Sequence, residues 1–126
     1  MPLAVIQARD LVRSLDIPAI SGVYAYSIPR EVLNNTDKNV ILITDANSNI
    51  SLEGSNDFYG LDRMVEVQVF YALHPGVDPE QLEVQLYKSF VHAGWTMGQN
   101  RGHQRDPDTG QIYTTFYVSN LEILKN

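Results

Sequence analysis

Chemistry in this sequence would have to come from three histidines and a short acidic motif. His103 precedes Asp106 and Asp108, a set that could serve a small metal-dependent hydrolase. His74 precedes a proline in a predicted turn, and His92 lies at the end of a predicted helix. No histidine belongs to an H-E-x-x-H motif, and no G-x-S-x-G motif supplies a nucleophilic serine. The sequence therefore indicates no catalytic constellation, and we expect a protein that is not an enzyme.

The same acidic motif has the spacing with which a calcium-binding loop begins. Such a loop also needs a bidentate glutamate further along, whereas Ile112 and Tyr113 follow here. Aspartates beside Pro107 and Gly110 are also typical of a β-turn, in which carboxylates accept hydrogen bonds from nearby backbone N–H groups. The sequence has no cysteine for a zinc site and no glycine-rich phosphate-binding loop. We therefore expect neither a metal nor a cofactor.

Composition narrows the class of protein further. The chain has 126 residues, 44% of them hydrophobic, which is enough for one domain over residues 1–126 with its own core. Its net charge of −6 and its scattered basic residues argue against specific nucleic-acid binding, which requires a basic stripe. The apolar start, residues 2–6, is too short to span a membrane, so no membrane contact is expected.

Two amphipathic helices are predicted. Apolar residues at helical spacing indicate the first over residues 3–15, and Pro18 ends it. The second covers residues 78–93, because Asp78 can cap free backbone N–H groups and Gly94 supplies a C-terminal stop. Its apolar stripe, which we expect to pack on a sheet, consists of Leu82, Leu86, Phe90 and Ala93, widened by Val84, Tyr87 and Val91.

Five strands complete the prediction. Residues 22–28 and 40–44 are rich in strand formers, and the second run is apolar enough to be buried on both faces. In residues 63–73 the odd-numbered side chains, including Leu73, face the core, while the even-numbered ones form a mixed surface. A hairpin that turns at residues 106–110 follows the second helix. The order α-β-β-β-α-β-β predicts an α+β fold, with two helices packed on a mostly antiparallel sheet.

One segment of different character lies between the predicted strands. Residues 45–60 carry Asn, Ser, Gly and Asp at most positions, with Ile50, Leu52, Phe58 and Tyr59 dispersed among them. This composition predicts a loop, and a loop of that length in a compact domain is usually functional or disordered. Because a monomer gains little by exposing apolar side chains, we expect this loop to become ordered against a partner.

Three motifs follow one another in the second half of the chain. They are the strand at residues 65–71, the proline-capped helix ending at Gly94-Trp95, and the turn at residues 106–111 that leads into Phe116-Tyr117. Together they resemble a family of small tail proteins of siphophages and of prophages in Gram-positive bacteria, over nearly the whole chain. This family is similar to tail terminators, which form a hexameric ring on the tail tube of long-tailed phages. The resemblance implies a structural protein that stops tube growth and offers a docking face to the head's neck proteins.

The resemblance also implies partners and a location. The partners are further copies of the chain in a ring, most simply of six, the tail-tube protein and a head-neck protein. The location is the virion tail, after assembly in the host cytoplasm. A ring requires one head-to-tail contact that repeats. The candidate residues for contact with another subunit or with the tail tube are Asn47, Leu52, Phe58, Tyr59, Glu66, Gln68, Arg101, His103 and Arg105.

Charge suggests how these contacts would be made, and two alternatives stay open. Arg101 and Arg105 would pair with acidic residues such as Glu53 or Asp57 of a neighbour, which would set the register more than the affinity. A head-completion or neck protein could share the same architecture. From a different class, the alternative is the metal-dependent hydrolase that uses His103 with the two aspartates of the acidic motif.

Overall fold

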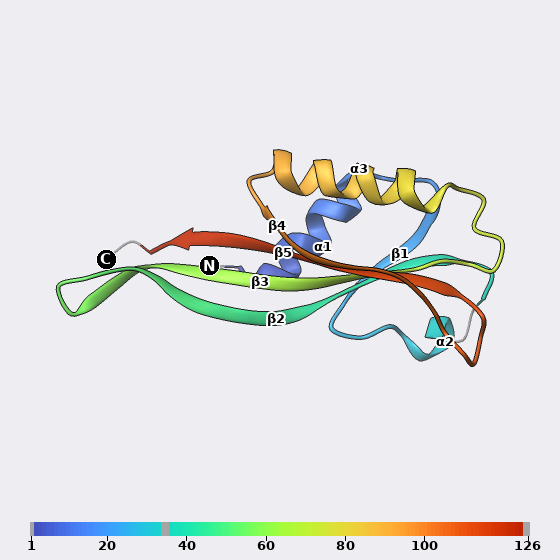
Figure 1. The fold of residues 1–126 in the computed structure, drawn as a ribbon, viewed down its shortest axis with the longest axis horizontal. Helices are drawn as coiled ribbons and strands as arrows, with labels where there is room; N and C mark the ends of the chain where they lie inside the picture. Colours follow the sequence, from blue (N-terminus) through green and yellow to red (C-terminus); the bar gives the residue numbers. More distant parts are fainter. Residues whose placement is uncertain (1, 34–35, 125–126) are drawn as a thin grey trace.

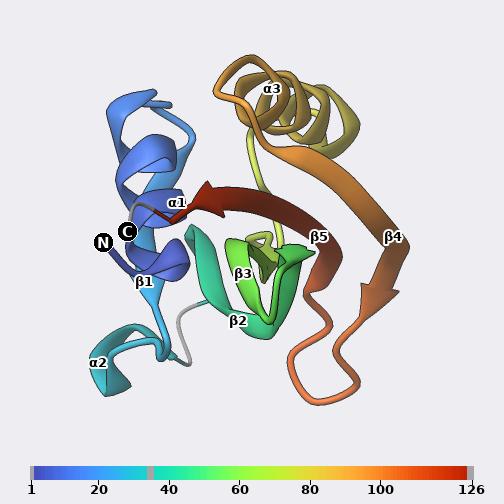
Figure 2. The ribbon, with the colours of Figure 1, turned by 90° about the vertical axis from the view of Figure 1, so that its left-hand side faces the viewer.

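Figure 1 shows a computed structural model that describes residues 2–33 and 36–124. The fold is α+β, as predicted. Helices α1 (Ala4–Ser14) and α3 (Pro79–His92) lie on the same side of a five-stranded sheet, as the end-on view in Figure 2 shows. A further helix, α2 (Arg30–Leu33), is a single turn that the sequence did not lead us to expect.

The sheet is antiparallel except at one edge. Its order is β1-β2-β3-β5-β4, in which only β1 and β2 run parallel. β3 lies at the centre of the sheet and pairs with β2 on one side and with β5 on the other. The strands are β1 (Ile20–Ala25), β2 (Asn39–Gly54), β3 (Asp57–Phe70), β4 (Thr96–Arg105) and β5 (Ile112–Ile123).

The hydrophobic core lies between the helices and the sheet. Leu86 and Phe90 of α3 are fully buried, and so are Val67 and Val69 of β3. The Phe90 ring meets the rings of Trp95 and Phe116 edge to face, with centroids 5.5 Å and 6.3 Å away. The predicted packing of the α3 stripe on the odd-numbered residues of β3 is therefore confirmed.

Both ends of α3 follow from its sequence. The Asp78 carboxylate accepts a hydrogen bond from the Glu80 backbone N–H at 3.0 Å, and Pro79 occupies the first turn, where no N–H is needed. Gly94 follows Ala93, the C-cap residue of the helix, and has a φ of +93°, a conformation that favours glycine. The predicted caps are confirmed.

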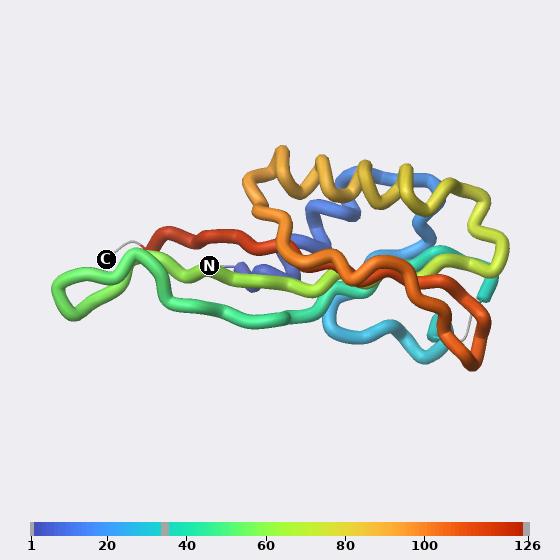
Figure 3. The backbone as a smooth tube through the Cα atoms, viewed as in Figure 1, coloured from blue at the N-terminus to red at the C-terminus, as the bar shows by residue number. Residues whose placement is uncertain are grey.

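The prediction of a loop at residues 45–60 is wrong. β2 continues to Gly54 and β3 starts at Asp57, so the segment is a long hairpin closed by a two-residue turn. Ser55 and Asn56 in this turn have φ values of +50° and +64°, as a tight hairpin turn of matching twist requires. We call its projecting part, residues 49–62, the arm; it extends past the helices at the left of Figure 3.

Three smaller expectations also fail. Leu73 is 48% exposed because β3 ends at Phe70, so it does not reach the core. In α3 the side chains of Val84 and Val91 are exposed, as is Ala93, because only one narrow stripe of the helix meets the sheet. In β2, Leu42 is half-buried, since the helices cover only one face of that strand.

The α3–sheet core can be tested by truncating one of its side chains. We expect Leu86→Ala to lower the free energy of unfolding by about 2–5 kcal/mol, because it opens a cavity at a fully buried position. Val84→Ala, on the exposed side of the same helix, is the control and should change it by less than about 0.5 kcal/mol. Urea denaturation of both variants measures the difference, and equal stabilities would contradict this core.

Candidate functional site

The structure does not assemble the histidine and aspartates that a hydrolase would use. The Nε2 atom of His103 lies 2.8 Å from the Glu83 carboxylate. Asp106 instead accepts a hydrogen bond from the Asp108 backbone N–H at 2.8 Å, which makes the predicted aspartate turn. Within residues 2–33 and 36–124, no three His, Cys, Asp or Glu side chains could hold a metal ion together.

A buried carboxylate, which sequence reasoning missed, lies between α3 and the sheet. Glu83 is 4% exposed, and its carboxylate accepts hydrogen bonds from the hydroxyl groups of Tyr71 at 2.5 Å and Tyr87 at 3.4 Å. An ionised Glu83 accepts the His103 contact as well, and the Tyr87 hydroxyl accepts from the Asn100 amide at 2.7 Å. The cluster therefore ties α3 to β4. The only signal for it in the sequence is the helical spacing of Glu83 and Tyr87.

Burial keeps the two tyrosines of this cluster protonated. Burial first, and then the neighbouring Glu83 carboxylate, raises the pKa of Tyr71 far above its ordinary value of 10. The same causes raise the pKa of Tyr87 to about 12. Both hydroxyl groups therefore remain protonated donors at neutral pH, and neither is a ready nucleophile. The arrangement stabilises a buried charge and holds two elements together.

The sheet face opposite the helices brings together three of the predicted contact residues. Asn47, Glu66 and Arg101 line one shallow depression of about 460 Å³. Across its floor, the Tyr117 hydroxyl donates to Glu66 at 2.9 Å, and the Arg101 guanidinium carbon lies 5.4 Å from the centre of the Tyr117 ring. Gln68 lies further along the same strand and contacts the Thr115 hydroxyl at 3.4 Å.

The arm carries the apolar contact residues. Leu52 and Tyr59 are 47% and 37% exposed, and Phe58 is half-buried. Leu52 and Leu121 pack over Gly60, where a Cβ atom would come within 3.0 Å and 3.1 Å of their methyl groups. Ile50 of the arm and Ile123 of β5 are also exposed, at 53% and 65%.

The remaining predicted residues lie elsewhere. Arg105 donates a hydrogen bond to the Gly110 carbonyl at 2.9 Å and so supports the turn between β4 and β5. This turn and the tip of the arm lie at opposite ends of the longest axis in Figure 1. The predicted contact residues therefore divide among the arm, the sheet face opposite the helices, the far turn and, for His103, the Glu83 cluster, and they do not form one site.

The sequence matches a known protein family. The sequence model of one family, described as "Protein of unknown function (DUF806)", matches residues 2–122. The chain belongs to this DUF806 family. No curated protein matches the chain. In the part of this DUF806 protein that the structure describes, no helix is long and apolar enough to cross a membrane.

The Glu83 cluster of this DUF806 protein predicts a loss of stability at alkaline pH. A tyrosine whose pKa is raised on folding contributes stability that is complete below pH 10 and is lost as pH rises through the folded-state pKa. We therefore expect the free energy of unfolding to fall between pH 10 and about 12 as Tyr87 ionises, and further as Tyr71 does. Chemical denaturation across this pH range measures the fall.

The matched controls for this experiment are two phenylalanine variants. Tyr87→Phe removes one of the titrating hydroxyl groups and should make the fall shallower, whereas Tyr26→Phe alters an exposed ring that is 47% accessible and should not. An identical pH dependence in the parent protein and in Tyr87→Phe would show that this hydroxyl group is not the cause.

Proposed function

We propose that this protein is a tail terminator of a long-tailed phage or prophage. In this role, copies of it form a ring that closes the end of the tail tube and presents a docking face to the neck of the head. The observation that carries the proposal is the arm, whose exposed apolar side chains are not covered by the helices of its own chain. The resemblance to small tail proteins supplies the kind of assembly.

The distribution of apolar surface supports an assembly part. Ile50 and Leu52 on the arm, together with Leu121 and Ile123 on β5, expose between 46% and 65% of their surface at one end of the molecule. Exposed apolar side chains gathered at one place mark contact sites for other proteins more often than isolated ones do. The body beneath them has its own core, so the arm is available for contacts that form after folding.

Charge is compatible with the same role. The protein carries a formal net charge of −6. Three of its nine Lys and Arg side chains have partners within the chain: Arg101 lies over the Tyr117 ring, Arg105 donates to the Gly110 carbonyl and Arg63 donates to Gln7. A negatively charged ring would let DNA pass through its channel without binding it. The proposed location is the virion tail, with assembly in the host cytoplasm.

Deletion of the gene in its phage or prophage tests the proposal. We expect tails longer than normal and heads that are not joined to them, because nothing ends tube growth or offers the docking face. Electron microscopy measures both. Tails of normal length that lack heads would favour a neck protein instead, and normal tails joined to heads would refute both roles.

The contribution of the arm can be tested with purified protein and tail tubes. Ile50→Ser and Ile123→Ser alter exposed side chains, so stability should change by less than about 0.5 kcal/mol. Binding to tube ends should nevertheless weaken by about tenfold, because the variants lose apolar contact area. Val91→Ser, at a position 50% exposed on α3, is the control and should bind normally. Unchanged binding of both arm variants would contradict the role of the arm.

A further inference from the structure

Two different strands of the sheet, β4 and the outer part of β2, have a free edge. β4 is the last strand on one side. On the other side, β1 pairs with β2 only from Asn39 to Ile43. Among the residues that the structure describes, no strand pairs with the outer edge of β2 from Thr44 to Gly54. Free strand edges present unpaired N–H and C=O groups, which readily accept a further strand.

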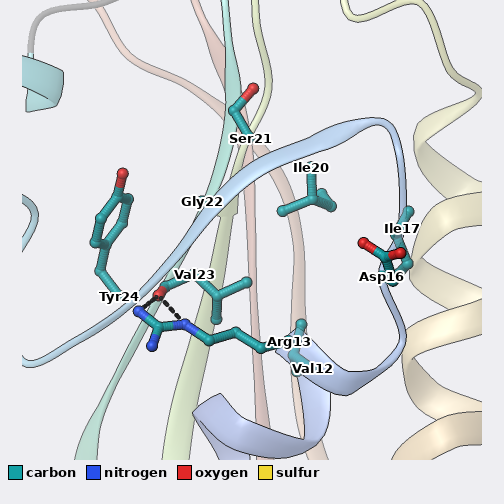
Figure 4. Close-up of a pocket in the computed structure, with 9 residues that line it drawn as sticks. All are labelled: Val12, Arg13, Asp16, Ile17, Ile20, Ser21, Gly22, Val23 and Tyr24. Atoms are coloured by element: carbon teal, nitrogen blue, oxygen red, sulfur yellow. Dashed lines mark hydrogen bonds between the residues drawn. The ribbon is translucent and has the colours of Figure 1, made fainter.

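The third candidate edge, on β1, is already engaged. Figure 4 shows Arg13 of α1 reaching the Val23 carbonyl in the middle of β1. Both Nε and Nη2 of Arg13 donate to this oxygen, at 3.1 Å and 2.7 Å. The hollow of about 370 Å³ beside it is therefore lined by a guanidinium that already has a partner. β1 offers less to an incoming strand than the other two edges do.

The two free edges carry opposite charges. Residues 44–54 of β2 contain two acidic side chains, Asp45 and Glu53, and no basic one. β4 contains Arg101, His103 and Arg105 and no acidic side chain. Pairing of two identical edges would place like charges opposite each other, which destabilises a strand pair, whereas pairing of β2 with β4 would place opposite charges together.

We propose that the outer edge of β2 in one copy pairs with the outer edge of β4 in a second copy, so that the sheet continues from subunit to subunit. This proposal adds a specific contact between subunits to the ring proposed above. It rests on that proposed function only for the closure of the subunits into a ring. The two edges are of similar length, 11 residues for 44–54 and 10 for β4. Because they lie on different sides of one sheet, the contact is head to tail, the type that generates a ring.

Strand directions and levels define the contact further. β4 runs opposite to β2, so a rotation about an axis along the strands makes the pair antiparallel. Through β5 and β3, β4 lies level with residues 40–47 of β2. Joining it to residues 44–54 of a neighbour therefore needs a stagger, as closed sheets with tilted strands have. In that alignment Asp45 lies near Arg105.

The irregular pairing of β4 limits the strength of the contact. Its register with β5 shifts between Met97 and Asn100, and again between Asn100 and His103. The Gly102 N–H is also taken by the Asn100 side chain at 2.8 Å. Only short runs of β4 are regular, so we expect copies in solution to associate at millimolar concentration and more tightly once they are held on a tube.

Cysteine cross-linking tests the contact directly, because the natural chain has no cysteine. Ser51→Cys on β2 and Gln99→Cys on β4, which face each other when Asp45 lies near Arg105, are made in separate chains, mixed at millimolar concentration and oxidised. We expect a disulfide-linked dimer mainly in the mixture, since each chain supplies a different edge. Ser21→Cys on β1 is the control and should link to neither. Predominant links between identical variants, links to Ser21→Cys, or no link at all would overturn the proposal.

Charge reversal provides the second measurement. Asp45→Lys and Arg105→Glu should each weaken self-association in sedimentation by about tenfold, and the double variant should recover it. Unfolding curves of each variant check that Arg105→Glu leaves the fold intact. Failure of the double variant to recover association would contradict the pairing.

The outcomes separate this contact from the proposed function. If the edges cross-link but deletion of the gene leaves normal tails, the contact stands and the tail-terminator role fails. If deletion gives long tails without any link between β2 and β4, the role stands and this contact fails.

Discussion

The lengths of the helices limit how much of the sheet this protein can cover with its own chain. α1 and α3 contain 11 and 14 residues, which corresponds to ~16 Å and ~21 Å of helix. β2 contains 16 residues, which corresponds to roughly 53 Å of strand. The far end of the β2–β3 hairpin must therefore lie beyond the helices, where it meets water or another molecule.

Two buried charges fix the body on which this hairpin is mounted. Arg63 of β3 is 6% exposed and lies next to the arm. It donates hydrogen bonds to the Pro2 carbonyl at 2.7 Å and to the Gln7 side chain at 3.0 Å, and these bonds hold α1 at the base of the arm. Glu83 joins α3 to the irregular strand β4. Removal of one partner from such a buried group costs more than its net stabilisation, because the other partner remains unsatisfied. A rigid body with one uncovered end is the result.

Periodicity was enough to predict the fold class and the two main helices. The alternating valines of β3 and the capped stripe of α3 each meet the core where the sequence places them, because burial on one face leaves a clear pattern. The arm was missed for the opposite reason. Helices cover neither face of residues 49–62, so apolar and polar side chains do not alternate there and the sequence does not show the pattern of a strand. The tight turn at Ser55-Asn56 was the available clue. The Glu83 cluster could not be predicted as a whole, because, apart from Glu83 and Tyr87, its members are distant in sequence and meet only through the packing of α3 over β4.

Hydrogen exchange of the arm tests the central claim most directly, which is that the arm is completed by another molecule. In the free subunit, backbone amides of residues 49–62 should exchange faster than those of residues 64–70, where helices cover β3. When tail tubes are added, the arm should become protected while the body changes little. Arm amides that exchange slowly in a proven monomer, or that exchange equally fast with and without tubes, would contradict the account.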